Sequence, residues 1–278
     1  MKVRLKIGLI SLILISCCFA ETIPRPEYPR PQFRRESWIN LNGRWTYKLD
    51  FSNSGKDRNF QESKGFENEI LVPFCPESKL SGVEYKDFIL AMWYHRKINI
   101  PENWDNKNVI LNFGGVDYKC EVYIDGKPVG KHWGGMAGFG FDISNYVEPG
   151  QKHDLVVYVY DNNRSGTQSG GKQSIQYHSW ECYYTRTTGI WQTVWMESIN
   201  KHGLKSCHIV PDLDGSRFIF SPKFYAEKRD YKLKIKVKEN SKLVASKKVS
   251  ATNLNSCILN IKEPKLWSVD NPFLYDVF

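Results

Sequence analysis

The sequence predicts an all-β protein built from two successive β-sandwiches, and three observations lead to that prediction. Aromatic residues make up 14% of the 278 residues, and 13 Pro and 20 Gly accompany them, which favours strands and turns over helices. Short alternating apolar stretches recur at the spacing that is typical of sandwiches. No apolar period of 3.6 residues is sustained over the length of a helix.

The first sandwich is expected within the first 200 residues, after an arm that four prolines between Glu21 and Arg35 hold extended. Asp125-Gly126 is a two-residue turn signal and predicts a hairpin at this point of the sandwich. The expected strands are Trp38–Leu49, Met92–Ile100, Val109–Phe113, Lys119–Ile124, Phe139–Ile143, Asp154–Tyr160 and Gly189–Ser198.

A second, smaller sandwich of immunoglobulin-like spacing is expected from residue 200 onward. Another strand begins near Asn271, and the chain ends within it at Phe278, so we expect an incomplete, C-terminally truncated sandwich with an open sheet edge. The strands expected before it are Lys205–Val210, Arg217–Tyr225, Tyr231–Glu239, Lys242–Ser250 and Cys257–Ile261.

The formal net charge of +9 raises the question of an anionic partner. Much of the excess lies in residues 231–238, where four lysines alternate with apolar residues. This pattern indicates a strand with one buried face and one solvated lysine face, which protects a sheet edge from pairing with another chain. No nucleic-acid-binding motif accompanies the charge, so the solvated face is favoured over an anionic partner and no nucleic acid is expected.

The first twenty residues are typical of an export signal, because a basic start precedes the short apolar stretch Ile7–Ile15. Two kinds of processing remain open, namely cleavage after Ala20 and lipidation of Cys17 within a segment that resembles a lipobox. No later stretch is long and apolar enough to span a bilayer. We therefore expect an exported protein, periplasmic or extracellular, or a lipoprotein.

Neither a metal site nor a catalytic centre is predicted from the sequence. Five cysteines remain beyond the signal at wide spacing, and they are expected to be buried thiols. No C-x-x-C pair, H-E-x-x-H helix, P-loop, dinucleotide-binding glycine motif or G-x-S-x-G elbow occurs, so no metal and no cofactor are expected.

One long polar loop, Asp161–Gln173, is the strongest candidate for a binding function. It follows an apolar strand and leads to Tyr177, Trp180, Tyr183 and Tyr184. Long loops on a rigid β scaffold frequently carry function. Amide, carboxylate and ammonium groups beside aromatic rings suit a sugar, because they match its hydroxyl groups and its apolar face. The alternative is a solvated loop without a ligand.

Several motifs together resemble family-2 glycoside hydrolases, the group that contains β-galactosidases, β-glucuronidases and β-mannosidases. Seven of them occur in the order of that family's N-terminal sugar-binding domain, and one is similar to the end of its second domain. The motifs are Trp38–Trp45, Val72–Gly82, Met92–Arg96, Asn112–Tyr118, Val122–Gly126, Gly134–Gly135 with Phe139–Ile143, Thr185–Trp195 and, in the second domain, Lys265–Tyr275.

The resemblance implies a jelly-roll (galactose-binding-like) β-sandwich over residues 21–199, after the signal at 1–20, and an incomplete immunoglobulin-like β-sandwich over 200–278. In the family a (β/α)₈ barrel follows, and two of its glutamates carry out retaining hydrolysis. The resemblance therefore implies that this chain holds no catalytic residue and that its partner is the missing barrel.

In the family, polar loops of the first domain line the rim of the sugar pocket. Carried onto this chain, the resemblance implies binding or positioning roles for six residues, although Arg186 could equally pin the loop to the sheet. The six are Asp161, Gln168, Lys172, Gln173, Tyr184 and Arg186.

The expected function is thus that of the non-catalytic N-terminal part of an exported, β-galactosidase-like glycoside hydrolase, which supplies scaffold and pocket loops for a β-glycoside. Two alternatives are a stand-alone carbohydrate-binding protein and an inactive truncated gene product.

Overall fold

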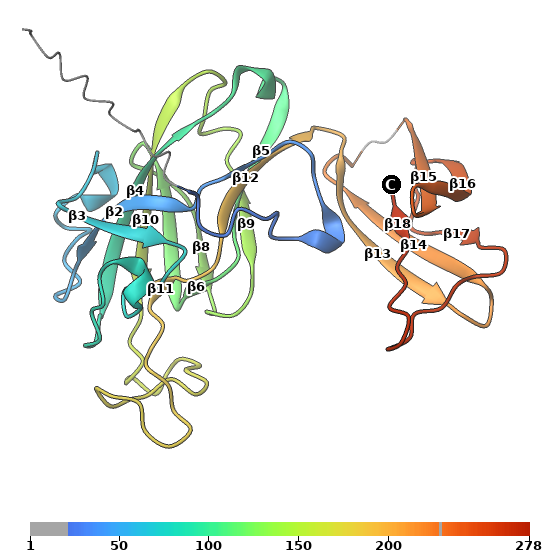
Figure 1. Ribbon diagram of the computed structural model, residues 1–278. Coiled ribbons are helices and arrows are strands. Elements are labelled where there is room, and N and C mark those ends of the chain that lie inside the picture. The colour runs from blue at the N-terminus through green and yellow to red at the C-terminus, as the bar shows by residue number, and fades with distance from the viewer. Residues whose placement is uncertain (1–21, 228–229) are drawn as a thin grey trace, which may run out of the picture.

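The computed structural model describes residues 22–227 and 230–278, which form two β-sandwiches in sequence (Figure 1). The predicted export signal and both of its processing sites lie outside the described residues. The described helices are 3-10 turns of three residues each, and none of them could cross a membrane. These turns are η1 (Pro31–Phe33), η2 (Phe60–Glu62), η3 (Lys79–Ser81) and η4 (Glu102–Trp104).

The first sandwich packs a four-stranded sheet against a six-stranded sheet, and all neighbouring strands are antiparallel. The four-stranded sheet has the order β1 (Trp38–Asn40), β12 (Val194–Asn200), β5 (Lys107–Phe113) and β9 (Phe139–Asp142). The six-stranded sheet has the order β3 (Asn68–Val72), β2 (Gly43–Leu49), β4 (Ala91–Asn99), β10 (Lys152–Tyr160), β7 (Lys119–Ile124) and β8 (Lys127–Trp133).

One predicted strand, Trp38–Leu49, is in fact two strands that belong to different sheets. The chain turns between them at Asn42, whose buried side chain accepts a hydrogen bond from the Val194 amide at 3.0 Å. Gly43 follows with a φ of +116°, a backbone conformation that residues other than glycine rarely adopt. The corner therefore transfers the chain from one layer of the sandwich to the other.

The six-stranded sheet is buried on both faces. Along β4, Met92 and Tyr94 face the core between the sheets, whereas Trp93 faces the opposite side. There the segment after β2 crosses the sheet, and Phe60 packs edge-on against Trp93 with ring centroids 5.8 Å apart. This double burial explains why β4 and β10 are almost continuously apolar instead of alternating.

The N-terminal arm is anchored on Glu197 of β12. Tyr28 donates a hydrogen bond to this carboxylate at 2.5 Å, and the Arg35 guanidinium pairs with it at 2.9 Å. Arg35 also donates to the carbonyl of Leu204 at 2.8 Å, at the start of the second sandwich. One side chain therefore links the arm, the first sandwich and the second.

The second sandwich consists of two three-stranded sheets around a small core that includes Phe220, Ile235 and Val237. One sheet has the order β13 (Leu204–Asp212), β14 (Arg217–Phe224) and β17 (Cys257–Asn260). The other has the order β16 (Lys242–Ser250), β15 (Lys232–Glu239) and β18 (Asp276–Val277).

The lysine-rich strand β15 is the central strand of its sheet, with β16 on one side and β18 on the other. The prediction that its lysines guard a sheet edge is therefore wrong. The prediction of buried thiols holds for Cys120 and Cys257, whereas Cys75 and Cys207 are half-buried and Cys182 is exposed on the loop after β10.

Candidate functional site

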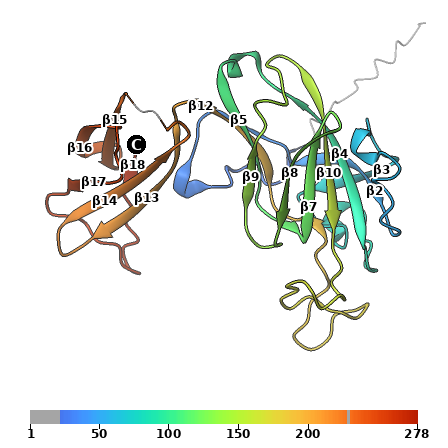
Figure 2. The ribbon, with the colours of Figure 1, turned by 180° about the vertical axis from the view of Figure 1, so that it is seen from behind.

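The loop between β10 and β11 (Gly189–Ile190) protrudes from one end of the first sandwich (Figures 1 and 2). Its 28 residues, 161–188, contain no strand of their own. The returning half is held to the outgoing half by backbone hydrogen bonds from Tyr184 to Lys172 and from Ser174 to Tyr184, at 2.8 and 2.7 Å. Near the tip, Trp180 and Tyr183 stack with ring centroids 4.7 Å apart. The loop is therefore an ordered projection.

Asp161 ties the two ends of this loop together. It is the first residue after β10 and is buried, with 5% of its surface exposed. Its carboxylate accepts hydrogen bonds from Gln168 at 2.6 Å and from the Thr188 hydroxyl at 2.9 Å. Gln168 in turn accepts from the amide of Asn162 at 3.1 Å. Asp161 and Gln168 thus form one hydrogen-bonded unit at the base of the loop.

Gln173 joins the middle of the loop to strand β6 (Val116–Asp117). Its amide nitrogen donates to Asp117 at 2.6 Å, and its amide oxygen accepts from the backbone of Thr187 at 2.8 Å. Both hydrogen-bonding groups of the side chain are therefore used inside the protein.

Arg186 organises the inner surface of the loop and is also buried. Its guanidinium donates to the carbonyls of Ser174 and Tyr177 at 3.2 and 3.3 Å, and it also bonds the carbonyls of Gln176 and Lys86. The same group lies 4.1 Å from the centroid of the Phe88 ring. Arg186 thus pins the loop to the segment before β4, the alternative that the sequence left open.

Lys172 and Tyr184 point outward and are exposed, Tyr184 to 64%. Tyr177 and Ile175 are similarly exposed on the same loop. Of the six residues predicted from sequence, four therefore face inward and hold the loop, and two are free to contact another molecule.

Three buried carboxyl groups lie beneath the loop, and only Asp161 among them was predicted from the sequence. Burial raises the pKa of Asp117 to about 7, assisted by the charge of Asp161 and opposed by the hydrogen bond from Gln173. Burial likewise raises the pKa of Glu77 to about 7, although hydrogen bonds from Thr188 oppose the rise. The pKa of Asp161 is also raised by burial.

One oxygen of Asp117 and one of Glu77 are buried without a hydrogen-bond partner. Burial without a partner disfavours a charged carboxylate, so this environment favours the protonated form of each group. Among residues 22–227 and 230–278, no cluster of histidine, cysteine or acidic residues has an arrangement that could hold a metal ion. Asp117 and Glu77 hold the loop in position through the hydrogen bonds that they accept from Gln173 and from the Thr188 amide.

Glu77 and Asp117 both lie in motifs that resemble those of the family, Val72–Gly82 and Asn112–Tyr118. The acidic residue within each mostly apolar or turn-forming motif was the one signal by which Glu77 and Asp117 could have been predicted as site residues. Their proximity to Asp161 was not predictable from sequence, because Asp117 and Glu77 lie 44 and 84 residues before it in the chain.

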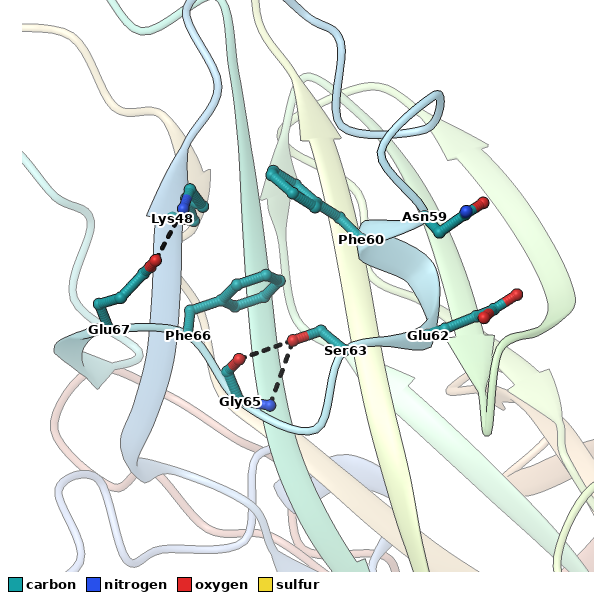
Figure 3. A pocket seen from close by; sticks show the side chains of 8 residues that line it. All are labelled: Lys48, Asn59, Phe60, Glu62, Ser63, Gly65, Phe66 and Glu67. Atoms are coloured by element: carbon teal, nitrogen blue, oxygen red, sulfur yellow. Dashed lines mark hydrogen bonds and ion pairs between the residues drawn. The ribbon is translucent and has the colours of Figure 1, made fainter.

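A shallow hollow on the outer face of the six-stranded sheet is a second candidate (Figure 3). Phe60 and Phe66 form its floor, and an ion pair of 2.8 Å between Lys48 and Glu67 closes one side. Ser63 and Gly65 bond to each other across the turn below. Its polar groups are largely satisfied within the protein, and its rings cover Trp93, so the hollow is part of the outer core.

Comparison with known proteins identifies the family. The profile of "Glycosyl hydrolases family 2, sugar binding domain" matches residues 39–197, more than half of the chain. The chain belongs to glycosyl hydrolase family 2. A second profile of the family, "Glycosyl hydrolases family 2", matches residues 204–278. The predicted family and the predicted pair of β-sandwiches are thereby confirmed.

Relatives within family 2 carry two different names. The chain is 26% identical to a β-galactosidase of Thermoanaerobacter pseudethanolicus over 250 residues, which cover 86% of this chain and 32% of that one. It is 25% identical to a putative β-glucuronidase of Formosa agariphila over 285 residues, which cover 96% and 32%. The chain thus spans about a third of the length of these curated relatives.

Among solved structures, the β-glucuronidase of Ruminococcus gnavus in complex with uronic deoxynojirimycin has the same fold over this region. The TM-score is 0.70 at 21% identity, and the match covers 90% of this chain and 43% of the other.

Proposed function

We propose that residues 21–199 and 200–278 are the non-catalytic N-terminal part of an exported glycosidase that hydrolyses β-glycosidic bonds. Two facts support this: the relatives named β-galactosidase or β-glucuronidase are about three times as long as the match, and the described residues form sandwiches without a (β/α)₈ barrel. In this proposal the barrel carries the chemistry. The two sandwiches support it.

The loop at residues 161–188 suggests that the first sandwich contributes to substrate binding as well as supporting the barrel. It projects past the end of both sheets, yet hydrogen bonds of two buried side chains, Asp161 and Arg186, and two half-buried ones, Gln168 and Gln173, fix its base. Binding energy is used best when the contacting groups are held in place before the ligand arrives. We propose that Tyr184 and Lys172 contact the sugar, the ring by stacking and the ammonium by bonding to hydroxyls or a carboxylate.

The remaining four candidates, Asp161, Gln168, Gln173 and Arg186, are positioning residues in this proposal. Their hydrogen-bonding groups are largely occupied within the protein, so they act through the shape of the loop.

The proposal is tested by the coding DNA beyond codon 278 and by turnover assays on the purified 278-residue chain. We expect an open frame that encodes a barrel with two catalytic glutamates. We also expect no hydrolysis of nitrophenyl β-galactoside or β-glucuronide by the 278 residues alone. Reproducible turnover by this chain contradicts the non-catalytic role.

Calorimetric titration with galactose and glucuronate separates the proposal from a stand-alone binding protein. We expect no measurable binding without the barrel, because the loop supplies only part of the pocket. Saturable binding by the isolated chain through the loop at residues 161–188 supports the stand-alone alternative instead.

Export to the periplasm or the extracellular space is part of the proposal and rests on the composition of the first twenty residues. Mass spectrometry of the mature protein tests it. We expect a chain that begins at Glu21. An unprocessed N-terminus contradicts export, and a lipid on Cys17 identifies a lipoprotein.

A further inference from the structure

The outer face of the sheet β16–β15–β18 is covered with lysine. Along β15 the apolar residues Leu233, Ile235 and Val237 pack against the core of the second sandwich. The alternating residues on the other face of the strand are Lys232, Lys234, Lys236 and Lys238. Alternate residues of a strand are about 6.6 Å apart, so this lysine row extends over about 20 Å.

Protection of a sheet edge does not explain the lysine row, because β15 is the central strand. Its backbone is paired from Lys232 to Glu239 with β16, and Val237 and Lys238 are paired with β18. Lysines on a central strand block no edge.

The lysine row is also unfavourable for folding. Lys234 lies directly opposite Lys248 of β16, and like charges in directly opposed positions destabilise a sheet. Within the described residues, no ion pair involves Lys232, Lys234, Lys236 or Lys248. One acidic residue, Asp276 of β18, lies in register with the row, opposite Lys238. A conflict between local charge and stability of this kind points to an external counter-charge.

We propose that the lysine row binds an extended acidic polysaccharide whose uronate carboxylates pair with the ammonium groups. A straight row on one strand suits a linear polymer, which can meet successive charges at regular intervals. Ser246 and Ser250 lie opposite Lys236 and Lys232, and both are exposed. Their hydroxyl groups can bond sugar hydroxyls between the charged contacts.

Two other polyanions fit the lysine row less well. No aromatic residue alternates with the four lysines of β15, and the Phe278 ring beside the row carries the Lys238 ammonium over its face, 4.4 Å from the centroid. Proteins that bind single-stranded nucleic acid usually stack bases on several aromatic rings. Membrane-surface binding generally adds an apolar face to the basic one, and the apolar residues of β15 are directed into the core. The choice of a carbohydrate among polyanions rests on the proposed function.

The lysine row lies far from the loop at residues 161–188. In both views β15 and β16 are at the end of the molecule remote from the first sandwich (Figures 1 and 2). Binding here would tether a polymer to the protein without occupying the loop.

The test compares two triple variants of equal net charge by affinity electrophoresis in gels that contain polygalacturonate. One variant, Lys232→Gln with Lys234→Gln and Lys236→Gln, removes three charges of the lysine row. The control replaces Lys97, Lys127 and Lys152 of the first sandwich with Gln; these are exposed and in no ion pair of the described residues.

We expect the wild type and the control to be retarded by polygalacturonate and not by neutral dextran, with weaker retardation as salt rises. The row variant should bind at least about tenfold more weakly. Its thermal midpoint should not fall, because the substitutions remove repulsion and no buried contact.

Equal binding by the row variant and the wild type overturns the proposal, and so does an equal loss in the control. Tighter binding of DNA or of phosphatidylserine vesicles through the same lysines overturns the assignment to a polysaccharide. The assay measures binding and not turnover, so a negative result does not contradict the proposed glycosidase function. Conversely, a coding DNA without a barrel would not contradict binding by the lysine row.

Discussion

Replacing the buried Asp117 with Asn should stabilise the first sandwich at alkaline pH and leave it unchanged in acid. Asp117 is 1% exposed and carries a pKa raised to about 7 from its ordinary 3.8. Between these two values the folded protein holds a proton that the unfolded chain has released. The contribution of Asp117 to the free energy of unfolding therefore falls as the pH rises from about 4 to 7, and this contribution changes no further above that.

The magnitude follows from the pKa difference. Each tenfold change in the ionisation constant is about 1.4 kcal/mol, so the ionised Asp117 costs the folded state up to about 4 kcal/mol at pH 8. Asn keeps the shape of the side chain, and its amide oxygen can still accept the hydrogen bond that Gln173 donates to Asp117. The variant should equal the wild type near pH 4 and exceed it by up to about 4 kcal/mol at pH 8.

Urea unfolding followed by tryptophan fluorescence measures this difference, since eight of the nine tryptophans precede residue 200 and report on the first sandwich. Asp57→Asn, on the exposed surface, is the matched control and should show the pH dependence of the wild type. A variant with the same pH dependence as the wild type, or with lower stability at pH 8, refutes the reasoning.

Three further substitutions test other features of the fold. Arg186→Ala removes the group that bonds four backbone carbonyls, and limited proteolysis should cut the 161–188 loop at least about tenfold faster while the unfolding midpoint of the sandwich changes little. Gly189→Ala should cost about 2–4 kcal/mol in urea unfolding, because φ is +76° and the new Cβ would lie 2.1 Å from the Tyr94 hydroxyl; unchanged stability contradicts the close packing. Arg35→Ala leaves the buried Glu197 without its ion pair and should cost about 3 kcal/mol, whereas unchanged stability would show that the hydrogen bonds from Tyr28 and Trp195 suffice.

Local patterns predicted much of the fold. Alternation and turn chemistry are properties of neighbouring residues, so the hairpin around Asp125-Gly126 was predictable, and β7 and β8 do pair across it. The break inside Trp38–Leu49 was not, because it depends on a hydrogen bond from Val194 to Asn42, 152 residues away in the sequence.

The same limit applies to the candidate site. Polar composition and family motifs pointed to the correct loop. Whether a polar side chain points inward depends on partners far along the chain, as in the bonds from Gln173 to Asp117 and from Arg186 to Lys86. The role of the lysines on β15 was misjudged for a related reason, since strand order within a sheet is set by the whole fold.

In the first sandwich the first strand of the chain pairs with the last, and this has a consequence for synthesis on the ribosome. β1 begins at Trp38 and pairs along its length with β12, whose final residue is Asn200. The four-stranded sheet therefore cannot be completed until about 200 residues have left the exit tunnel. Until Asn200 has emerged, the nascent chain therefore exposes an apolar layer that the completed sheet covers in the folded protein, and such a surface is prone to aggregate.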